Sequence, residues 1–188
     1  TFHIGGIAEA GGDITMGLPR VEEIFEKRMP KNCGTLSEAD GTILEVTGGK
    51  NDRTVVVLGE DGVSHEHSIS PNRVVLGKPG EAVARGAALT DGSFHLPDLF
   101  RLAGRERAED YVLREINRVY SLHGASIARK HMEIIIRQQF SRVRITAPGD
   151  TEFLEGEMAE RARFEEELAR VRSEGGAEPE AAEIMLGI

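Results

Sequence analysis

Several features are scarce or absent in this 188-residue sequence, and each absence narrows the class of protein. Cys33 is the single cysteine, so an internal disulfide is excluded and no second cysteine is available for a zinc site. One unpaired thiol fits a reducing compartment. No stretch of about 18 apolar residues occurs, so the sequence predicts no membrane span. Tryptophan is absent and glycine occurs 22 times, which favours a loop-rich, modular body over one large core.

Positive charge is also in short supply. The formal net charge is −9, which argues against indiscriminate nucleic-acid binding by the whole chain. The charge is unevenly distributed: residues 101–145 hold ten Lys or Arg and five Asp or Glu, whereas residues 150–188 hold four Arg and twelve Asp or Glu. The middle of the chain is therefore suited to face a phosphate backbone, and the acidic tail is not.

Residues 32–95 are rich in β-branched side chains and turn residues, which predicts a β-rich module. Thr54–Leu58 has the composition of a compact strand, and Ser64–Ile69 alternates as a strand with one buried face does. Gly77–Gly92 contains a G-x-x-V-x-x-G-x-x-L run, which resembles the closing hairpin of a barrel-sandwich hybrid. The sequence therefore predicts a small β-barrel or sandwich-like module here.

Residues 96–148 become helical and predict a two-helix segment. The first helix is expected over Ala108–His123 and ends at Gly124, because glycine commonly follows the last turn of a helix. The second is expected over Ser126–Phe140. The apolar positions predicted to face inward are Val112, Ile116, Val119, Tyr120, Met132, Ile135, Ile136 and Phe140.

The remaining residues, 149–188, are predicted to form an acidic C-terminal helix and tail. A charged helix is expected over residues 156–173, and Gly175–Glu180 is expected to be mobile. Val143–Thr146, just before this region, has the pattern of a short strand. Together these elements predict an α+β fold, in which the small β module is combined with several α-helices.

The first 31 residues have the sequence features expected of a lid, a glycine-rich loop followed by a short helix. Gly5–Gly12 is rich in glycine, and Gly17 supplies backbone freedom just before Pro19, whose fixed φ suits the first turn of a helix. An amphipathic helix follows and ends at Met29-Pro30, because a residue before proline is pushed out of the α region. The sequence therefore predicts a short helix entered through a mobile glycine-rich loop.

This lid contains two sequence blocks, TFHIGG at residues 1–6 and DIT-x-GLPRVEEIFE at 13–26. They occur in the order and at the separation expected for the family that they resemble. Together they resemble the trigger loop of the largest catalytic subunit, beta-prime, of bacterial DNA-directed RNA polymerase. E-x-x-x-V-Y-x-x-H-G at 115–124 and K-H-M-E-I-I-I-R-Q at 130–138 resemble a two-helix part of the cleft of that subunit. The resemblance covers essentially the whole chain.

The resemblance implies a division of labour along the chain. Residues 1–31 would be the trigger-loop tip and distal helix, the first half of 32–95 the jaw beside downstream duplex DNA, and 96–148 part of the cleft wall. It also implies a cytoplasmic, nucleoid-associated protein that assembles with the beta, alpha, omega and sigma subunits and meets template DNA, RNA and NTP. Because the chain starts at Thr1 without methionine, we expect a C-terminal fragment of a longer subunit.

His3 is the candidate catalytic residue. In nucleotidyl transfer, negative charge moves to the departing pyrophosphate, and the protein positions groups and supplies positive charge. An imidazole at the β-phosphate can donate a hydrogen bond, add charge or act as a general acid, and the sequence leaves these roles open. By the resemblance, Phe2 and Ile4 would lie next to the substrate. The expected hinges are Gly5, Gly6 and Gly17.

Two further groups of residues are candidates for binding. Basic residues gather on the second helix and the strand after it, where they would face phosphate, form surface ion pairs or contact another part of the polymerase. His65 and His67 share one face of a strand; a metal would need a third ligand that is not apparent, so a solvated face is expected. The basic candidates are Arg129, Lys130, Arg137, Arg142 and Arg144.

The D-F-D-G-D type of motif that holds catalytic magnesium in the family does not occur in this sequence. We therefore expect no metal or other cofactor within this chain, magnesium supplied by residues outside it, and no polymerase activity from the chain alone. Two alternatives remain. One is a biotinyl- or lipoyl-like carrier module with Lys50 near a Gly-Gly turn, and the other is a stand-alone DNA-binding module.

Overall fold

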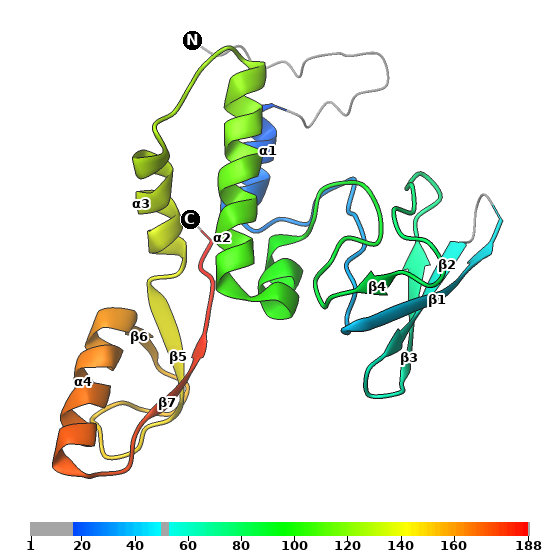
Figure 1. The fold of residues 1–188 in the computed structure, drawn as a ribbon. Helices are drawn as coiled ribbons and strands as arrows, with labels where there is room; N and C mark the ends of the chain where they lie inside the picture. Colours follow the sequence, from blue (N-terminus) through cyan, green and yellow to red (C-terminus); the bar gives the residue numbers. More distant parts are fainter. Residues whose placement is uncertain (1–16, 50–52, 188) are drawn as a thin grey trace. The chain divides into compact units, whose positions relative to one another are not determined.

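A computed structural model of the chain describes residues 17–49 and 53–187 (Figure 1). The chain divides into two compact units, one formed by Pro19–Arg114 and the other chiefly by Glu115–Ile188. The described residues form helices and two antiparallel sheets, which confirms the predicted α+β fold class.

The unit Pro19–Arg114 contains the predicted β module as a four-stranded antiparallel sheet with the order β3-β2-β1-β4. Its strands are β1 Gly41–Gly48, β2 Arg53–Gly59, β3 Ser64–Ile69 and β4 Ala82–Val83. Strand β2 contains the predicted Thr54–Leu58 segment, and burial alternates along it, with Val55 and Val57 turned inward and fully buried. The core of the module consists of Ile43, Val55, Val57, Ile69 and Leu89.

A bulge in β1 decides which of two neighbouring apolar residues joins this core. The pairing of β1 with β2 shifts between Ile43 and Glu45, so Leu44 has no partner in the ladder. Ile43 is completely buried, whereas Leu44 keeps 47% of its surface exposed. Without the bulge, the two-residue period of the strand would place every later side chain on the opposite face.

The hairpin predicted over Gly77–Gly92 is wrong. Only β4 forms there, as a two-residue strand paired with β1, and the rest is held by isolated bridges and single hydrogen bonds such as Leu76 N–H to the Leu89 carbonyl at 2.9 Å. The physical reason is backbone conformation. Gly80, Gly86 and Gly92 have φ values of 86°, 73° and 111°, which an extended strand does not accommodate.

Helix α2 spans Leu96–Leu122 and is longer than the predicted Ala108–His123, because the segment that begins at Leu96 joins it across a kink. Gly104 marks the kink with φ 80° and ψ 179°, a conformation that is essentially restricted to glycine. Helix α1, Leu18–Phe25, begins directly after Gly17 as predicted, and its Val21 and Ile24 are buried. It ends at Phe25 and not at the predicted Met29-Pro30, because Lys27 adopts a positive φ of 58° that interrupts the helix.

The second unit contains a three-stranded antiparallel sheet with the order β6-β5-β7, in which the last strand returns beside β5 (Figure 1). Val143, Ile145, Phe153 and Ala159 form its core. Its elements are α3 Arg129–Gln139, β5 Arg142–Ala147, β6 Met158–Glu160, α4 Arg161–Glu174 and β7 Glu180–Glu183.

Three expectations for this unit need correction. The charged helix begins at Arg161 rather than 156, because Met158–Glu160 pairs with β5 as a strand. The segment 175–180 is held in place: Ala177 N–H donates to the Asp150 carboxylate at 2.7 Å, and Glu180 starts β7. On α3, Met132, Ile136 and Phe140 are buried as predicted, but Ile135 is 40% exposed.

Replacing Ile43 by alanine should lower the free energy of unfolding by about 2–5 kcal/mol, because the side chain is fully buried and its loss leaves a cavity. Leu44→Ala, one residue further on but outside the core, is the matched control and should cost less than about 1 kcal/mol. Equilibrium urea unfolding of both variants measures the difference. Equal losses would show that the bulge does not assign the two side chains as described.

Gly104→Ala should destabilise the chain by about 1–3 kcal/mol, although alanine is the better helix former, because the kink requires a backbone conformation that alanine resists. Apart from the neighbouring residues and the backbone of the same helix, no heavy atom lies within 4 Å of an added Cβ, so the cost would come from the backbone conformation. Arg107→Ala, at an exposed position of the same helix, should stay within about 0.5 kcal/mol of the parent in thermal unfolding. A stabilised Gly104→Ala variant would mean that the helix straightens without penalty.

Candidate functional site

The predicted catalytic and substrate-adjacent residues lie in the part of the chain outside the described residues. The structure begins at Gly17, the last of the predicted hinges, which stands directly before α1. The other predictions for this segment therefore stay predictions. They concern Phe2, His3, Ile4, Gly5 and Gly6.

A buried arginine fixes the described part of the predicted lid. Arg20, in the first turn of α1, is only 4% exposed. One guanidinium nitrogen donates to the Glu23 carboxylate at 3.2 Å, and the other terminal nitrogen donates to the Tyr111 hydroxyl on α2 at 2.9 Å. Val21 and Ile24 pack inward beside it. The polar contacts of Arg20 and the apolar contacts of Val21 and Ile24 therefore fix the same face of this short helix.

The Tyr111 hydroxyl accepts a second hydrogen bond, from the backbone N–H of Phe94 at 2.8 Å. The rings of Phe94 and Tyr111 also lie in contact, with their centroids 5.7 Å apart. One hydroxyl thus joins α1, the loop before α2, and α2 itself. Sequence reasoning missed this junction, although one signal was available: Arg20 stands four residues before Ile24, on the apolar face of an amphipathic helix.

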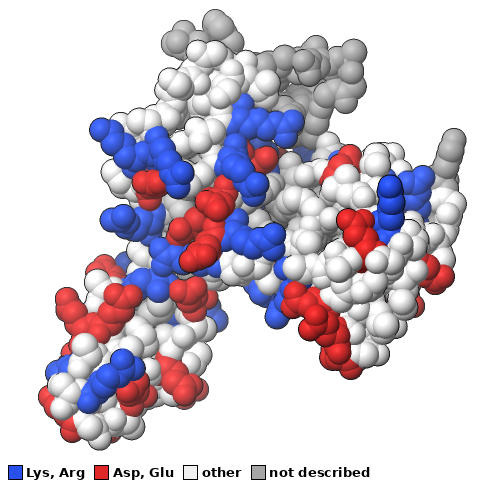
Figure 2. Space-filling model, viewed as in Figure 1, with Lys and Arg blue, Asp and Glu red and all other residues white. Residues whose placement is uncertain are grey.

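The predicted basic patch lies in the second unit, on α3 and β5, and Figure 2 shows Lys and Arg side chains gathered over α3. Arg129, Lys130, Arg137 and Arg144 are exposed, and Arg142 is half-buried opposite Glu160 in the sheet. Arg129 forms an ion pair with Glu133 at 2.6 Å, between side chains that are 72% and 46% exposed. Such an exposed pair contributes little to stability, because both charges stay largely solvated.

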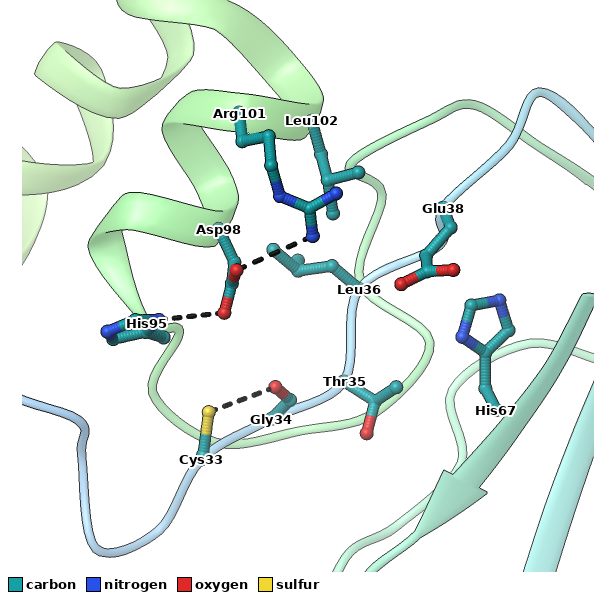
Figure 3. A pocket seen from close by; sticks show the side chains of 10 residues that line it. All are labelled: Cys33, Gly34, Thr35, Leu36, Glu38, His67, His95, Asp98, Arg101 and Leu102. Carbon is teal, nitrogen blue, oxygen red and sulfur yellow. Dashed lines mark hydrogen bonds and ion pairs between the residues drawn. The ribbon is translucent and has the colours of Figure 1, made fainter. Parts of the chain in front are cut away.

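The expectation of a solvated face for the two strand histidines is wrong for His67, which is only 7% exposed. It lies on the inner face of β3, where its ring borders a cavity of about 330 Å³ and faces the Glu38 carboxylate (Figure 3). Burial lowers the pKa of His67 below its ordinary value of 6.5, the charge of Glu38 raises that pKa, and His65 lowers it. The imidazole is therefore held neutral near neutral pH.

The other end of this cavity carries a chain of polar contacts at the start of α2. His95 Nδ1 lies 2.7 Å from one oxygen of Asp98, and an Arg101 nitrogen lies 3.5 Å from the other (Figure 3). Cys33 lies beside them, with its thiol directed at the Gly34 carbonyl at 3.4 Å. Asp98 also sits in the first turn of the helix, where a negative charge is favoured by the helix dipole. These contacts fix the helix start.

Two negative findings apply to residues 17–49 and 53–187 alone. No three His, Cys, Asp or Glu side chains are placed there to hold a metal ion. No helix within the same residues is long and apolar enough to cross a membrane.

Residues 45–175, more than half of the chain, match the family described as RNA polymerase Rpb1, domain 5. The chain belongs to this family. The match covers the sheet β1–β4 from Glu45 onward, all of α2 and α3, and the second unit through α4.

The chain is also similar over its whole length to curated bacterial proteins named DNA-directed RNA polymerase subunit beta'. It is 43% identical over 188 residues to the protein of Symbiobacterium thermophilum and 41% identical over 188 residues to that of Pelotomaculum thermopropionicum. The protein of Heliobacterium modesticaldum is 41% identical over 189 residues. The chain spans 16% of the length of each. The predicted resemblance to beta-prime is thereby confirmed.

The buried His67 should make the stability of the folded chain depend on pH. Because the pKa of His67 is lowered in the folded state, the unfolded chain binds more protons, and stability falls as pH drops through 6.5 toward the lowered value. His67→Gln should flatten this part of the profile, measured as urea midpoints from about pH 8 to about pH 5. His131→Gln makes the same substitution at an exposed position and is the matched control. Identical slopes for the His67 variant and the parent would contradict the assignment.

Proposed function

We propose that the chain acts as part of a beta' subunit in DNA-templated RNA synthesis. In this proposal residues 1–31 close over the incoming NTP as a trigger loop, and the β structure of residues 32–76 flanks downstream duplex DNA as a jaw. The observation that carries the proposal is the similarity of the entire chain to subunits named beta', at 43% identity in the first case. The two sequence blocks at residues 1–6 and 13–26 support the finer assignment.

His3 is the residue through which the closed lid would act. Placed at the β-phosphate, its imidazole would stabilise charge on the departing pyrophosphate by hydrogen bonding, by its own charge or by proton donation. Phe2 and Ile4 would pack against the base and the enzyme body. Gly5, Gly6 and Gly17 would absorb the backbone rotations of closure. The anchored helix α1 supports this proposal, because a lid needs a fixed base on which to fold.

The basic patch on α3 and β5 would face a nucleic-acid backbone or another subunit. The exposure of Arg137 and Arg144 supports such a role, because their guanidinium groups are accessible to phosphate oxygens. The acidic residues of the adjoining α4 would keep the rest of this unit away from DNA. The charge pattern thus favours contact through one limited surface.

The remaining parts of the polymerase would come from outside the chain. Catalytic magnesium would be held by residues elsewhere in beta', and the partners would be the beta, alpha, omega and sigma subunits together with template DNA, RNA and NTP. The chain alone would be inactive. Its working location would be the cytoplasm, at the nucleoid.

The two alternatives from the sequence have less support. A carrier module would need Lys50 as its modified residue, which lies outside the described residues, and the family match is to a polymerase. A stand-alone DNA-binding module would have to overcome a net charge of −9. Neither alternative accounts for similarity to beta' over the full length of the chain.

The test is single-turnover nucleotide addition by an assembled polymerase that carries His3→Ala or His3→Gln in beta'. We expect alanine to slow addition roughly tenfold or more, equivalent to about 1.4 kcal/mol of activation free energy. Recovery of most of the rate by glutamine would identify hydrogen bonding as the role of His3. Failure of glutamine to recover it would leave charge or proton donation.

His131→Ala is the matched control, because it removes a histidine from an exposed position on α3, in a different part of the chain. It should leave the rate of nucleotide addition unchanged. Unchanged rates for both His3 variants would refute the assignment of residues 1–31 as the lid.

A further inference from the structure

We propose that the β module binds the phosphate backbone of downstream duplex DNA through one end of its sheet only, the end that carries Arg53 and Arg73. This inference rests on the proposed function of residues 32–76 as a jaw, and it names the part of the jaw that would meet DNA. All the residues that carry it belong to the unit Pro19–Arg114.

The strand register brings the two arginines to the same end of the sheet. Arg53 begins β2, where it pairs with Gly48, the last residue of β1, and with Ile69, the last residue of β3. The N–H of Arg73 donates to the carbonyl of Ser70, directly after β3, at 3.0 Å. Figure 2 shows Lys and Arg side chains near the end of the sheet where β2 begins.

The positive charges of both arginines are available to a ligand. Within residues 17–49 and 53–187, no acidic side chain forms an ion pair with Arg53 or Arg73. Arg105 of the same unit differs, because the Glu109 carboxylate holds its guanidinium at 2.5 Å. Arg53 and Arg73 are half-buried, which suits an apolar stem packed on the protein with a charged head in water. Such a guanidinium can donate two parallel hydrogen bonds to a phosphate.

The opposite end of the sheet is acidic. Glu60 and Asp61 directly follow β2, and the Glu60 N–H donates to the carbonyl of Asp40, directly before β1, at 2.9 Å. These three residues line one hollow of about 300 Å³ together with Glu38 and Arg85. Asp and Glu side chains gather near the start of β1 in Figure 2. A phosphate backbone would be repelled from this end.

The two ends are far enough apart to act independently. Strand β2 spans seven residues between them, which corresponds to about 20 Å at roughly 3.3 Å per residue. At physiological salt, interactions between exposed charges are largely screened beyond about 8 Å. The acidic end therefore does not cancel the attraction of Arg53 and Arg73 for phosphate. A chain with a net charge of −9 can thus still contact DNA through this one end.

The experiment measures how tightly an assembled polymerase binds a template with a long downstream duplex over a range of salt concentrations. Arg53→Met and Arg73→Met each remove one positive charge and keep an apolar stem. Loss of one phosphate contact should reduce the slope of log K against log salt by about 0.9 and weaken binding about eightfold at about 0.1 M salt. The double variant should reduce the slope by about twice as much.

Three controls isolate the charge and its place in the module. Arg53→Lys and Arg73→Lys keep a positive charge on a long stem, so they should keep the salt slope of the parent, whereas a purely structural role would not follow the charge. Arg85→Met removes an exposed arginine at the acidic end and should leave the slope unchanged. On a template whose downstream duplex is cut short before the jaw, all variants should bind as the parent does.

Photochemical cross-linking of the parent polymerase to its downstream duplex separates the inference from the proposed function. If residues 32–76 cross-link and the methionine variants keep the parent slope, the inference is overturned while the jaw assignment stands. An equal loss of slope in Arg85→Met would also overturn it, because binding would not be confined to one end. Absence of any cross-link from residues 32–76 would refute the jaw function, and the inference with it. If one methionine variant does not assemble, the other arginine carries the test.

Discussion

A guanidinium buried in protein must keep its hydrogen-bond partners, and this constraint governs how the first helix is attached. Arg20 satisfies it with Glu23 on its own helix and Tyr111 on α2. The tyrosine oxygen in turn satisfies a backbone N–H in the loop before α2. Removing either side chain would take one hydrogen bond away from a buried polar group, at a cost of about 1–3 kcal/mol. The position of α1 is therefore specified by polar geometry as well as by apolar packing.

The fold of the β module depends on a second constraint, the register of its strands. Its core is small, and the register decides which side chains enter it. The bulge after Ile43 keeps that residue inside and turns Leu44 outward, and the sheet then closes over Val55, Val57 and Leu89. At the edge of the sheet, burial lowers the pKa of His67 and keeps it neutral. A titratable group on the inner face of an edge strand links the stability of this module to pH.

Local patterns predicted the elements with strong periodicity or clear punctuation. Strand β3 spans Ser64–Ile69 as predicted, and α1 begins after Gly17 and runs through its apolar stripe. The stop at Gly124 follows from its positive φ of 69°. The family resemblance, drawn from short blocks in the sequence, was confirmed by similarity over the whole chain.

Long-range features were beyond local patterns. Strands β6 and β7 are short and largely exposed, and they exist because β5 offers both of its edges to them. The burial of His67 depends on tertiary structure, because the cavity beside its ring is lined by residues far away in the sequence. The Arg20–Tyr111 bond joins positions 91 residues apart, which no local period indicates. His3 stays a prediction from the sequence blocks.

The proposal that most needs a direct test is that residues 1–31 act as a trigger loop, in which residues 1–12 would close over NTP. Hydrogen exchange in an assembled polymerase, with and without matched NTP, tests it most directly. The account predicts that matched NTP slows exchange in residues 1–12, whereas Leu18–Phe25 is protected in both states. Exchange in residues 1–12 that is indifferent to NTP, or α1 amides that exchange as fast as those residues, would contradict it.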